Sequence, residues 1–419
     1  MLKPIFQSPK NQNYFFGYYD KSQLNYSSTK LLAMRVDFLD RIPDRNDRAV
    51  IGYFDLKEEG QRFVEVADTR TFNWQQGCML QWLGPDYESK IIYNDLEKES
   101  FVSVILDLNN GERKTQPMPI YTIAPDGKSA LCIDHERHHF CRRSYSYDGV
   151  VNREKNKNIV SGDGIWRLDL ETGQTQQILA LEDLIANKTL SNMEGGIHYL
   201  EHLMLNPSGD RLCFLHRWQM QEGGIFDRLY TVDPNGKSLY LLNDSGRASH
   251  FCWRNDNEIL LYGGIANPVN SLRRYKKLVR YLFKPLLPVY HMLVADNSFF
   301  SKALTGDSYI LLTDQSEEKR RVAPELSLED GHPSFPPGKQ EVFISDTYPD
   351  LDSGSIAKLL QYNLETGEYQ ILAELDSIPK YDNTGVRCDL HPKCSYDGKY
   401  VSIDTMDRGV RGTYIYRVF

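Results

Sequence analysis

The sequence of 419 residues contains no long hydrophobic run and no secretion signal. A membrane-spanning helix needs about 20 consecutive apolar residues, and no stretch of this chain approaches that length. The first eight residues, MLKPIFQS, include a lysine and a proline but lack the apolar core of a signal peptide. We therefore expect a soluble, cytoplasmic protein.

Cysteine pairs, excess positive charge and several common enzyme motifs are also missing. The seven scattered cysteines form no tight disulfide framework, which favours a reducing compartment. A formal net charge of −8 argues against a nucleic-acid-binding protein, because such proteins need a basic face. The absence of a Gly-x-Ser-x-Gly elbow, a phosphate loop and a dinucleotide-binding motif argues against serine hydrolases and nucleotide-binding folds.

A repeated turn is the main feature that the sequence does contain. A small residue or proline, then Asp, Ser or Asn, then glycine recurs between apolar runs, as in Ala124-Pro-Asp-Gly-Lys and Asn206-Pro-Ser-Gly-Asp. Such turns close β-hairpins, because proline presets φ and glycine takes a positive φ. Their spacing fits multiples of roughly 41–43 residues, the length of one β-propeller blade. A second turn, as in Asp169-Leu-Glu-Thr-Gly, alternates with the first and fits the outer hairpin of a blade.

The repeat predicts an all-β fold, a single-domain, seven-bladed β-propeller. The last blade ends without a partner strand, so we expect residues 1–8 to complete it and to remove the exposed edges. The predicted blades span residues 15–70, 71–117, 118–190, 194–245, 246–327, 328–380 and 384–419.

One segment does not fit the propeller pattern. Residues 272–292 read LRRYKKLVRYLFKPLLPVYHM, with apolar residues on one helical face and basic residues around the rest. The pattern predicts a short basic helical insertion. This insertion either packs on the edge of a blade or lies on an anionic membrane, in which case the protein would be peripheral to the inner membrane.

The ten histidines stand at particular places in the repeat. Most of them lie at the start or end of a predicted innermost strand, including His202, His216, His250, His332 and His391. In a propeller those strand ends converge on the central channel. We therefore expect histidines from several blades to share a site.

Four residues form a candidate metal site. Cys388 and His391 have the spacing of a metal-binding pair, and His332 and Asp346 lie at the two ends of the neighbouring inner hairpin. One thiolate, two imidazoles and one carboxylate would form a closed, structural zinc site. The alternative is a buried cysteine beside a packed histidine. The run Asp134-His-Glu-Arg-His-His is a weaker candidate, because adjacent residues on a strand point to opposite faces.

Seven short motifs, taken in order, resemble the seven-bladed polysaccharide lyases that include the oligogalacturonate and ulvan lyases. The resemblance implies a divalent metal held by histidines and a glutamine on neighbouring blades. His332, Cys388 and His391 match these positions, and cysteine in place of glutamine favours zinc over manganese. The motifs are Gly17-Tyr-Tyr-Asp, Asn73-Trp-Gln-Gln-Gly, Asn206-Pro-Ser-Gly-Asp to His216-Arg-Trp, Asp227-Arg-Leu-Tyr, Ser249-His-Phe-Cys-Trp, Gly331-His-Pro-Ser-Phe and Arg387-Cys-Asp-Leu-His-Pro.

The same resemblance implies which groups react. Arg228 and His250 match the arginine and the histidine that carry the chemistry in oligogalacturonate lyases. On the ulvan lyase side, the weaker candidates are His202, His216 and Tyr230. Three further residues are expected to contact the substrate, namely Arg137, Gln75 and Arg217.

These residue types suit β-elimination. The reaction removes the proton α to a uronate carboxylate and expels the 4-linked sugar, so a cation must neutralise the carboxylate. A neutral histidine is a suitable base near pH 7. We therefore expect a carbon–oxygen lyase that acts on acidic, uronate-containing oligosaccharides. The rival hypothesis is a non-catalytic propeller that binds glycan or protein partners in a surface-polysaccharide pathway, which the basic residues of 272–284 favour.

Overall fold

The structure is a computed structural model. It describes residues 1–58, 61–151, 154, 157–221, 224–264, 306–326, 329–349 and 354–419. The predicted basic insertion at 272–292 lies outside these residues, and with it both interpretations of that segment. Along the described ranges, no helix is long and apolar enough to cross a membrane.

The described chain forms seven small antiparallel sheets that follow one another along the sequence. Within each sheet, strands that follow one another in the sequence pair as neighbours, and the last sheet also includes the N-terminal strand. Six of the sheets have four strands, and the sheet that begins at Val342 has three. This is the pattern of a seven-bladed β-propeller, and the predicted all-β fold class is confirmed.

The strands of the first three sheets alternate with short turns. The first sheet contains β2 (Asn13–Phe15), β3 (Lys30–Val36), β4 (Ala49–Asp55) and β5 (Phe63–Thr69). The second contains β6 (Gln81–Trp82), β7 (Lys90–Glu97), β8 (Ser100–Asp107) and β9 (Arg113–Gln116). The third contains β10 (Thr122–Ile123), β11 (Ser129–Cys132), β12 (Gly164–Asp169) and β13 (Thr175–Ala180).

The remaining four sheets continue the same order. The fourth contains β14 (Ile197–Leu205), β15 (Leu212–Gln219), β16 (Ile225–Val232) and β17 (Tyr240–Asn243). The fifth contains β18 (Ala248–Trp253), β19 (Glu258–Gly263), β20 (Ser308–Thr313) and β21 (Lys319–Val322). The sixth contains β22 (Val342–Asp346), β23 (Ile356–Asn363) and β24 (Tyr369–Asp376). The last contains β25 (Lys393–Cys394), β26 (Tyr400–Thr405), β27 (Gly412–Arg417) and β1 (Phe6–Gln7).

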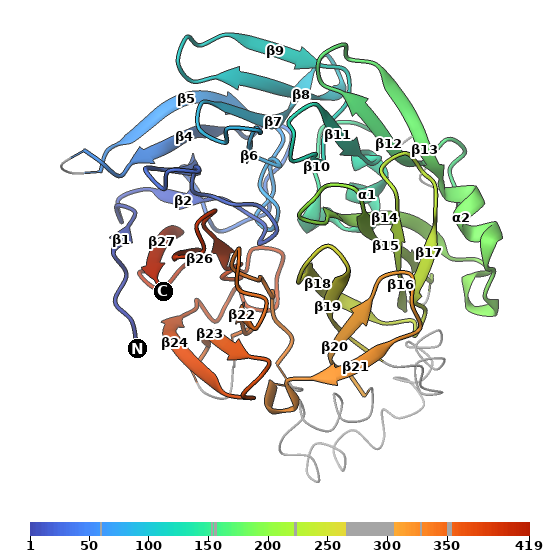
Figure 1. The fold of residues 1–419 in the computed structure, drawn as a ribbon. Helices are drawn as coiled ribbons and strands as arrows, with labels where there is room; N and C mark the ends of the chain where they lie inside the picture. Colours follow the sequence, from blue (N-terminus) through green and yellow to red (C-terminus); the bar gives the residue numbers. More distant parts are fainter. Residues whose placement is uncertain are drawn as a thin grey trace. The chain divides into compact units, whose positions relative to one another are not determined.

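The two ends of the chain meet in the last sheet. Strand β1 pairs antiparallel with β27, with Phe6 opposite Ile415 and Gln7 opposite Tyr414 (Figure 1). The backbone N–H of Ser8 also donates to the carbonyl of Thr413. The edge of β27 is therefore covered by the N-terminal segment, as the unpaired C-terminal strand of the sequence led us to expect.

The chain divides into two compact units, and each is described separately below. The first unit comprises Met1–Arg153, Trp166–Gln176 and Gly331–Phe419. The second comprises Glu154–Ile165 and Gln177–Asp330.

Each unit is held together by apolar side chains of its inner strands. Strand β15 is buried along almost its whole length, whereas the outermost strand β9 exposes most of its residues. In the second unit, Leu215, Phe251 and Ile310 belong to one core cluster that joins the fourth and fifth sheets. Burial of this kind contributes about 25 cal/mol per Å² of apolar surface, so stacked inner strands stabilise the fold and position the residues at their ends.

The repeated turns have the predicted conformation. Gly127, in the first turn, has a φ of +71°, and an added Cβ would lie 1.9 Å from the carbonyl oxygen of Gly84. Only glycine satisfies both constraints.

Helices are few and short in the described ranges. One of them corrects the sequence analysis, because residues expected on a strand form α1 (His135–Cys141). Asp134 caps this helix by accepting from the backbone N–H of Arg137 at 2.9 Å, which a strand would not allow. The others are α2 (Leu181–Asn187) and the 3₁₀ helices η1 (Arg143–Tyr145), η2 (Ser191–Met193) and η5 (Pro324–Leu326).

Candidate functional site

Two of the predicted metal ligands meet in the first unit. His332 lies before β22 and His391 lies just before β25, and both side chains are buried. Their ring centroids are 4.2 Å apart, with the ring planes almost perpendicular. Asp389 joins them, and the ligand atoms of the three residues all lie within 4.8 Å of one another. Two imidazoles and one carboxylate form a set that fits a divalent metal ion.

Other groups of the same unit orient both rings. The carboxylate of Asp346 accepts from Nδ1 of His332 at 2.8 Å and from the backbone N–H groups of His332 and His391. The Nδ1 of His391 donates to the carbonyl oxygen of Gly17 at 3.1 Å. With both Nδ1 atoms acting as donors, each neutral ring keeps its lone pair on Nε2. Metal-binding histidines are almost always held in this way.

The backbone around these residues is also fixed. His391 has a φ of +46°, a left-handed conformation that non-glycine residues rarely adopt and that occurs most often at functional sites. The carboxylate of Asp404 accepts from the N–H groups of Phe16 and Gly17, which holds the carbonyl that His391 contacts. The site is therefore supported before any metal binds.

The group that the structure brings together differs from the predicted zinc set in two members. Asp346 lies behind His332 and orients it instead of joining the ligand atoms. Cys388 is buried in an apolar cluster and is not among the three residues whose ligand atoms converge, and burial raises the pKa of its thiol to about 12.

Asp389 is the candidate ligand that the sequence analysis missed. The signal for it in the sequence was the Asp-x-His spacing to His391. Three protein ligands leave coordination positions open, whereas the predicted four-ligand set would have been closed.

We expect Asp346→Asn to lower metal affinity by about 10- to 100-fold, because an amide cannot act as a charged acceptor for all three N–H groups. Calorimetric titration of the metal-free variant with Zn²⁺ or Mn²⁺ would measure this. Asp397→Asn, at an exposed turn of the last sheet, is the control and should bind like the wild type. Equal affinities in the two variants would contradict the orienting role of Asp346.

The second unit contains a histidine–carboxylate pair at the predicted base. The Nδ1 of His250 lies 3.1 Å from Oδ1 of Asp330, and the hydroxyl of Ser249 donates to the other oxygen at 2.8 Å. Burial opposes ionisation of Asp330, but its interaction with His250 and the hydrogen bonds from His250 and Ser249 hold the pKa of the carboxyl below its usual value. Asp330 is therefore ionised near pH 7 and fixes the His250 ring with its hydrogen on Nδ1.

His202 accompanies this pair, whereas Arg217 does not act as predicted. The His202 ring stacks on His250 with centroids 6.0 Å apart, and His202 has a φ of +56°. Arg217, expected to contact the sugar, is paired with the carboxylates of Glu201 and Asp227. Its guanidinium also donates to the carbonyl of Ala248, so it connects β15 to the neighbouring strands.

His216, Arg228 and Tyr230 are not at a surface. All three side chains are fully buried. Arg228 donates to Nδ1 of His216 at 3.0 Å and to the carbonyl of Lys188. Burial and the positive charge of Arg228 hold the pKa of His216 well below its usual value, and burial raises the pKa of Tyr230 to about 12. Arg228 thus positions His216 and cannot reach a substrate carboxylate as the sequence analysis expected.

The two other predicted substrate contacts are also buried. The amide of Gln75 donates to the carbonyl of Arg387 at 3.2 Å, which ties two loops of the first unit together. Arg137 is buried in α1, with its guanidinium 6.0 Å from the ring of Phe140.

Comparison with known proteins supports the fold. No family model matches the chain, and no curated protein matches it in sequence. A solved oligogalacturonate lyase in complex with manganese aligns over 100 % of this chain and 96 % of its own, with a TM-score of 0.63 and 14 % identity. An oligogalacturonate lyase from Vibrio parahaemolyticus aligns over 100 % and 97 %, with a TM-score of 0.60 and 12 % identity. The resemblance indicated by the motifs is thus confirmed at the level of the fold.

Proposed function

We propose that this protein is a carbon–oxygen lyase that cleaves uronate-containing oligosaccharides by β-elimination. The observation that carries the proposal is the group formed by His332, Asp389 and His391, whose rings are held by Asp346 and by the carbonyl of Gly17. A divalent metal held by three protein ligands keeps open coordination positions. Such an ion suits β-elimination, because it can neutralise the negative charge that moves onto the uronate carboxylate as the α proton is removed. The manganese complex of the structurally similar oligogalacturonate lyase is consistent with such a group.

His332, Asp389 and His391 would hold the metal, and the bound ion would supply positive charge to the uronate carboxylate. Cys388 is outside this group, so the preference for zinc over manganese that was inferred from a cysteine ligand does not apply to it. We still propose zinc as the bound metal. Among first-row divalent metals, sites with nitrogen and oxygen ligands generally bind zinc more tightly than manganese, which ranks lowest.

His250 is the proposed base. With its hydrogen on Nδ1 and directed at Asp330, the Nε2 lone pair can accept the proton α to the uronate carboxylate. The electron pair of that C–H bond forms the C4–C5 double bond, and the C4–O bond to the leaving sugar breaks. The leaving oxygen takes up one proton, so the products are an unsaturated uronide and a shorter glycan.

A panel of acidic glycans tests the activity. Pectic, ulvan, glycosaminoglycan and capsular fragments would be incubated with metal-loaded protein while the ultraviolet absorbance of the unsaturated uronide is followed. We expect an increase with at least one fragment class and none after chelation of the metal. No increase with any class would contradict the proposed function.

A further inference from the structure

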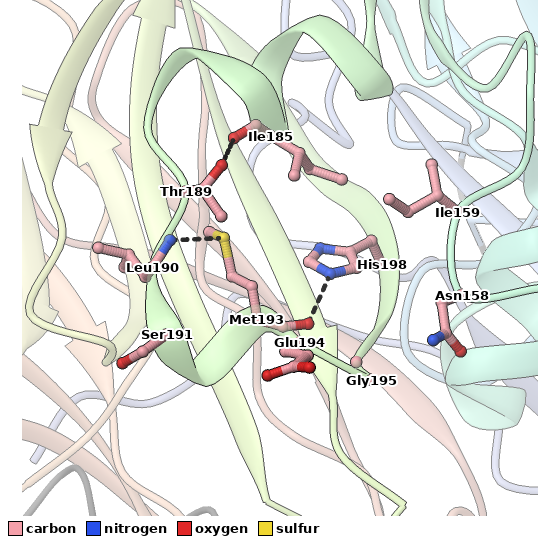
Figure 2. Close-up of a pocket in the computed structure, with 11 residues that line it drawn as sticks. Asn158, Ile159, Ile185, Thr189, Leu190, Ser191, Met193, Glu194, Gly195 and His198 are labelled. Atoms are coloured by element: carbon pink, nitrogen blue, oxygen red, sulfur yellow. Dashed lines mark hydrogen bonds between the residues drawn. The ribbon is translucent and has the colours of Figure 1, made fainter.

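A pocket of about 490 Å³ opens in the second unit beside the segment that leads into β14 (Figure 2). Pockets of this size, with an apolar wall and a few fixed polar groups, bind small molecules. The apolar wall consists of Ile159, Ile185, Leu190 and Met193. The polar side chains that line it are Asn158, Thr189, Ser191, Glu194 and His198.

Arg228 determines which nitrogen of each neighbouring histidine carries hydrogen. A guanidinium can only donate, so Nδ1 of His216 accepts from Arg228. Neutral His216 then carries its hydrogen on Nε2, which donates to Nδ1 of His198 at 2.9 Å. His198 in turn carries its hydrogen on Nε2. This N–H is directed at the Met193 carbonyl, 3.3 Å away at the wall of the pocket (Figure 2).

The donor that His198 offers at the wall of the pocket is uncharged. A proton on His216 would place a second positive charge against Arg228 in a fully buried position. A proton on Nδ1 of His198 would set two N–H groups against each other across the 2.9 Å contact. His198 therefore offers one N–H without a positive charge. Its 3.3 Å bond to Met193 is long, so the same N–H can be shared with a ligand oxygen.

The lining also selects against a charged ligand group. Glu194 is the acidic residue among the lining residues, and its carboxylate would repel a uronate carboxylate. The group that suits this pocket is an uncharged oxygen acceptor attached to a small apolar substituent. A carbonyl bound to a methyl group, as in an acetyl ester or an acetamide, has this chemistry.

We propose that the pocket binds the acyl group of a substituted sugar, with the carbonyl oxygen accepting from Nε2 of His198 and the methyl group lying against Ile159 and Ile185. The choice of a glycan as ligand rests on the proposed function. Acylated acidic glycans would then be the preferred substrate class. The sequence suggested a catalytic role for His216 and Arg228. In this proposal they instead keep the hydrogen of His198 on Nε2, where it can donate to the ligand.

Binding measured without turnover tests this proposal. The probes are N-acetyl-D-glucosamine for the acetamide, an O-acetylated oligogalacturonate for the ester, and D-glucose and the alkali-deacetylated oligomer as their controls. Saturation-transfer NMR with His250→Ala protein would detect contact with the acetyl methyl group, and titrations would give affinities. We expect at least one acylated probe to bind at least about tenfold more tightly than its control, and the two arms distinguish amide from ester.

Two variants locate the binding. Ile159→Trp should fill the pocket and weaken acyl binding at least about tenfold, whereas Ile178→Trp, a half-buried isoleucine of β13 outside the lining, should leave it unchanged. His198→Phe keeps an aromatic ring against Trp218 but removes the donor, so it should abolish the preference for acylated probes. Equal binding of acylated and control probes, or full binding by Ile159→Trp, would overturn the proposal. Selective acyl binding by a protein without lyase activity would support the pocket and count only against the proposed function.

Discussion

His250→Ala is expected to lower kcat/KM for the uronate substrate by about 10²- to 10⁴-fold, the usual contribution of a positioned general base. The variant removes the Nε2 atom that accepts the proton, while the residues of the metal group, His332, Asp389 and His391, are unchanged. Metal content measured by elemental analysis should therefore equal that of the wild type.

His139→Ala is the matched control for this experiment. His139 is a partly exposed histidine of α1 and belongs neither to the metal group nor to the His250–Asp330 pair. Its loss should therefore change kcat/KM less than twofold, within about 0.4 kcal/mol. If His250→Ala keeps its activity, the base lies elsewhere. If it loses the metal together with its activity, His250 is a ligand and not a base.

His391→Ala is expected to abolish metal binding and the thermal stabilisation that the metal provides. A metal present at 100 times its dissociation constant stabilises the native state by about 2.7 kcal/mol, and removal of one of three ligands eliminates most of this. Cys388→Ser should retain both the metal and the metal-dependent rise in Tm, because Cys388 lies outside the ligand group.

Differential scanning calorimetry with and without chelator would separate the two variants. Chelation should lower the Tm of the wild type and of Cys388→Ser by the same amount and leave that of His391→Ala unchanged. If Cys388→Ser loses zinc as His391→Ala does, the thiolate set inferred from the sequence is correct and the three-ligand group is not.

The fold could be predicted from the sequence because its repeated turns are local features of the sequence. The turn around Gly127 requires a positive φ, and such turns recur at the spacing of a blade. The unpaired C-terminal strand likewise indicated that Phe6 and Gln7 would lie beside β27. The run 134–139 was assigned to a strand, because the helix that forms there depends on the N-cap of Asp134, a contact that strand periodicity does not reveal.

The candidate sites could be predicted only in part, because the hydrogen-bond partners of their residues come from distant segments of the chain. His332 and His391 could be paired by their positions before inner strands. Asp330 carries no motif of its own, and Asp389 is marked only by its spacing to His391. The burial of Arg228 was not indicated by the sequence either. An arginine next to a predicted site suggests a substrate contact, but the hydrogen bonds of Arg228 go to internal groups, the ring of His216 and the carbonyl of Lys188.

Mass analysis of the products tests the central claim most directly. Elimination splits a glycan without adding water, so the masses of the two fragments should sum to the mass of the substrate, and one fragment should carry the double bond. We expect this result for an acidic oligosaccharide treated with metal-loaded wild-type protein. Fragments that together contain one additional water molecule, or no fragments from any acidic glycan, would contradict the assignment as a lyase.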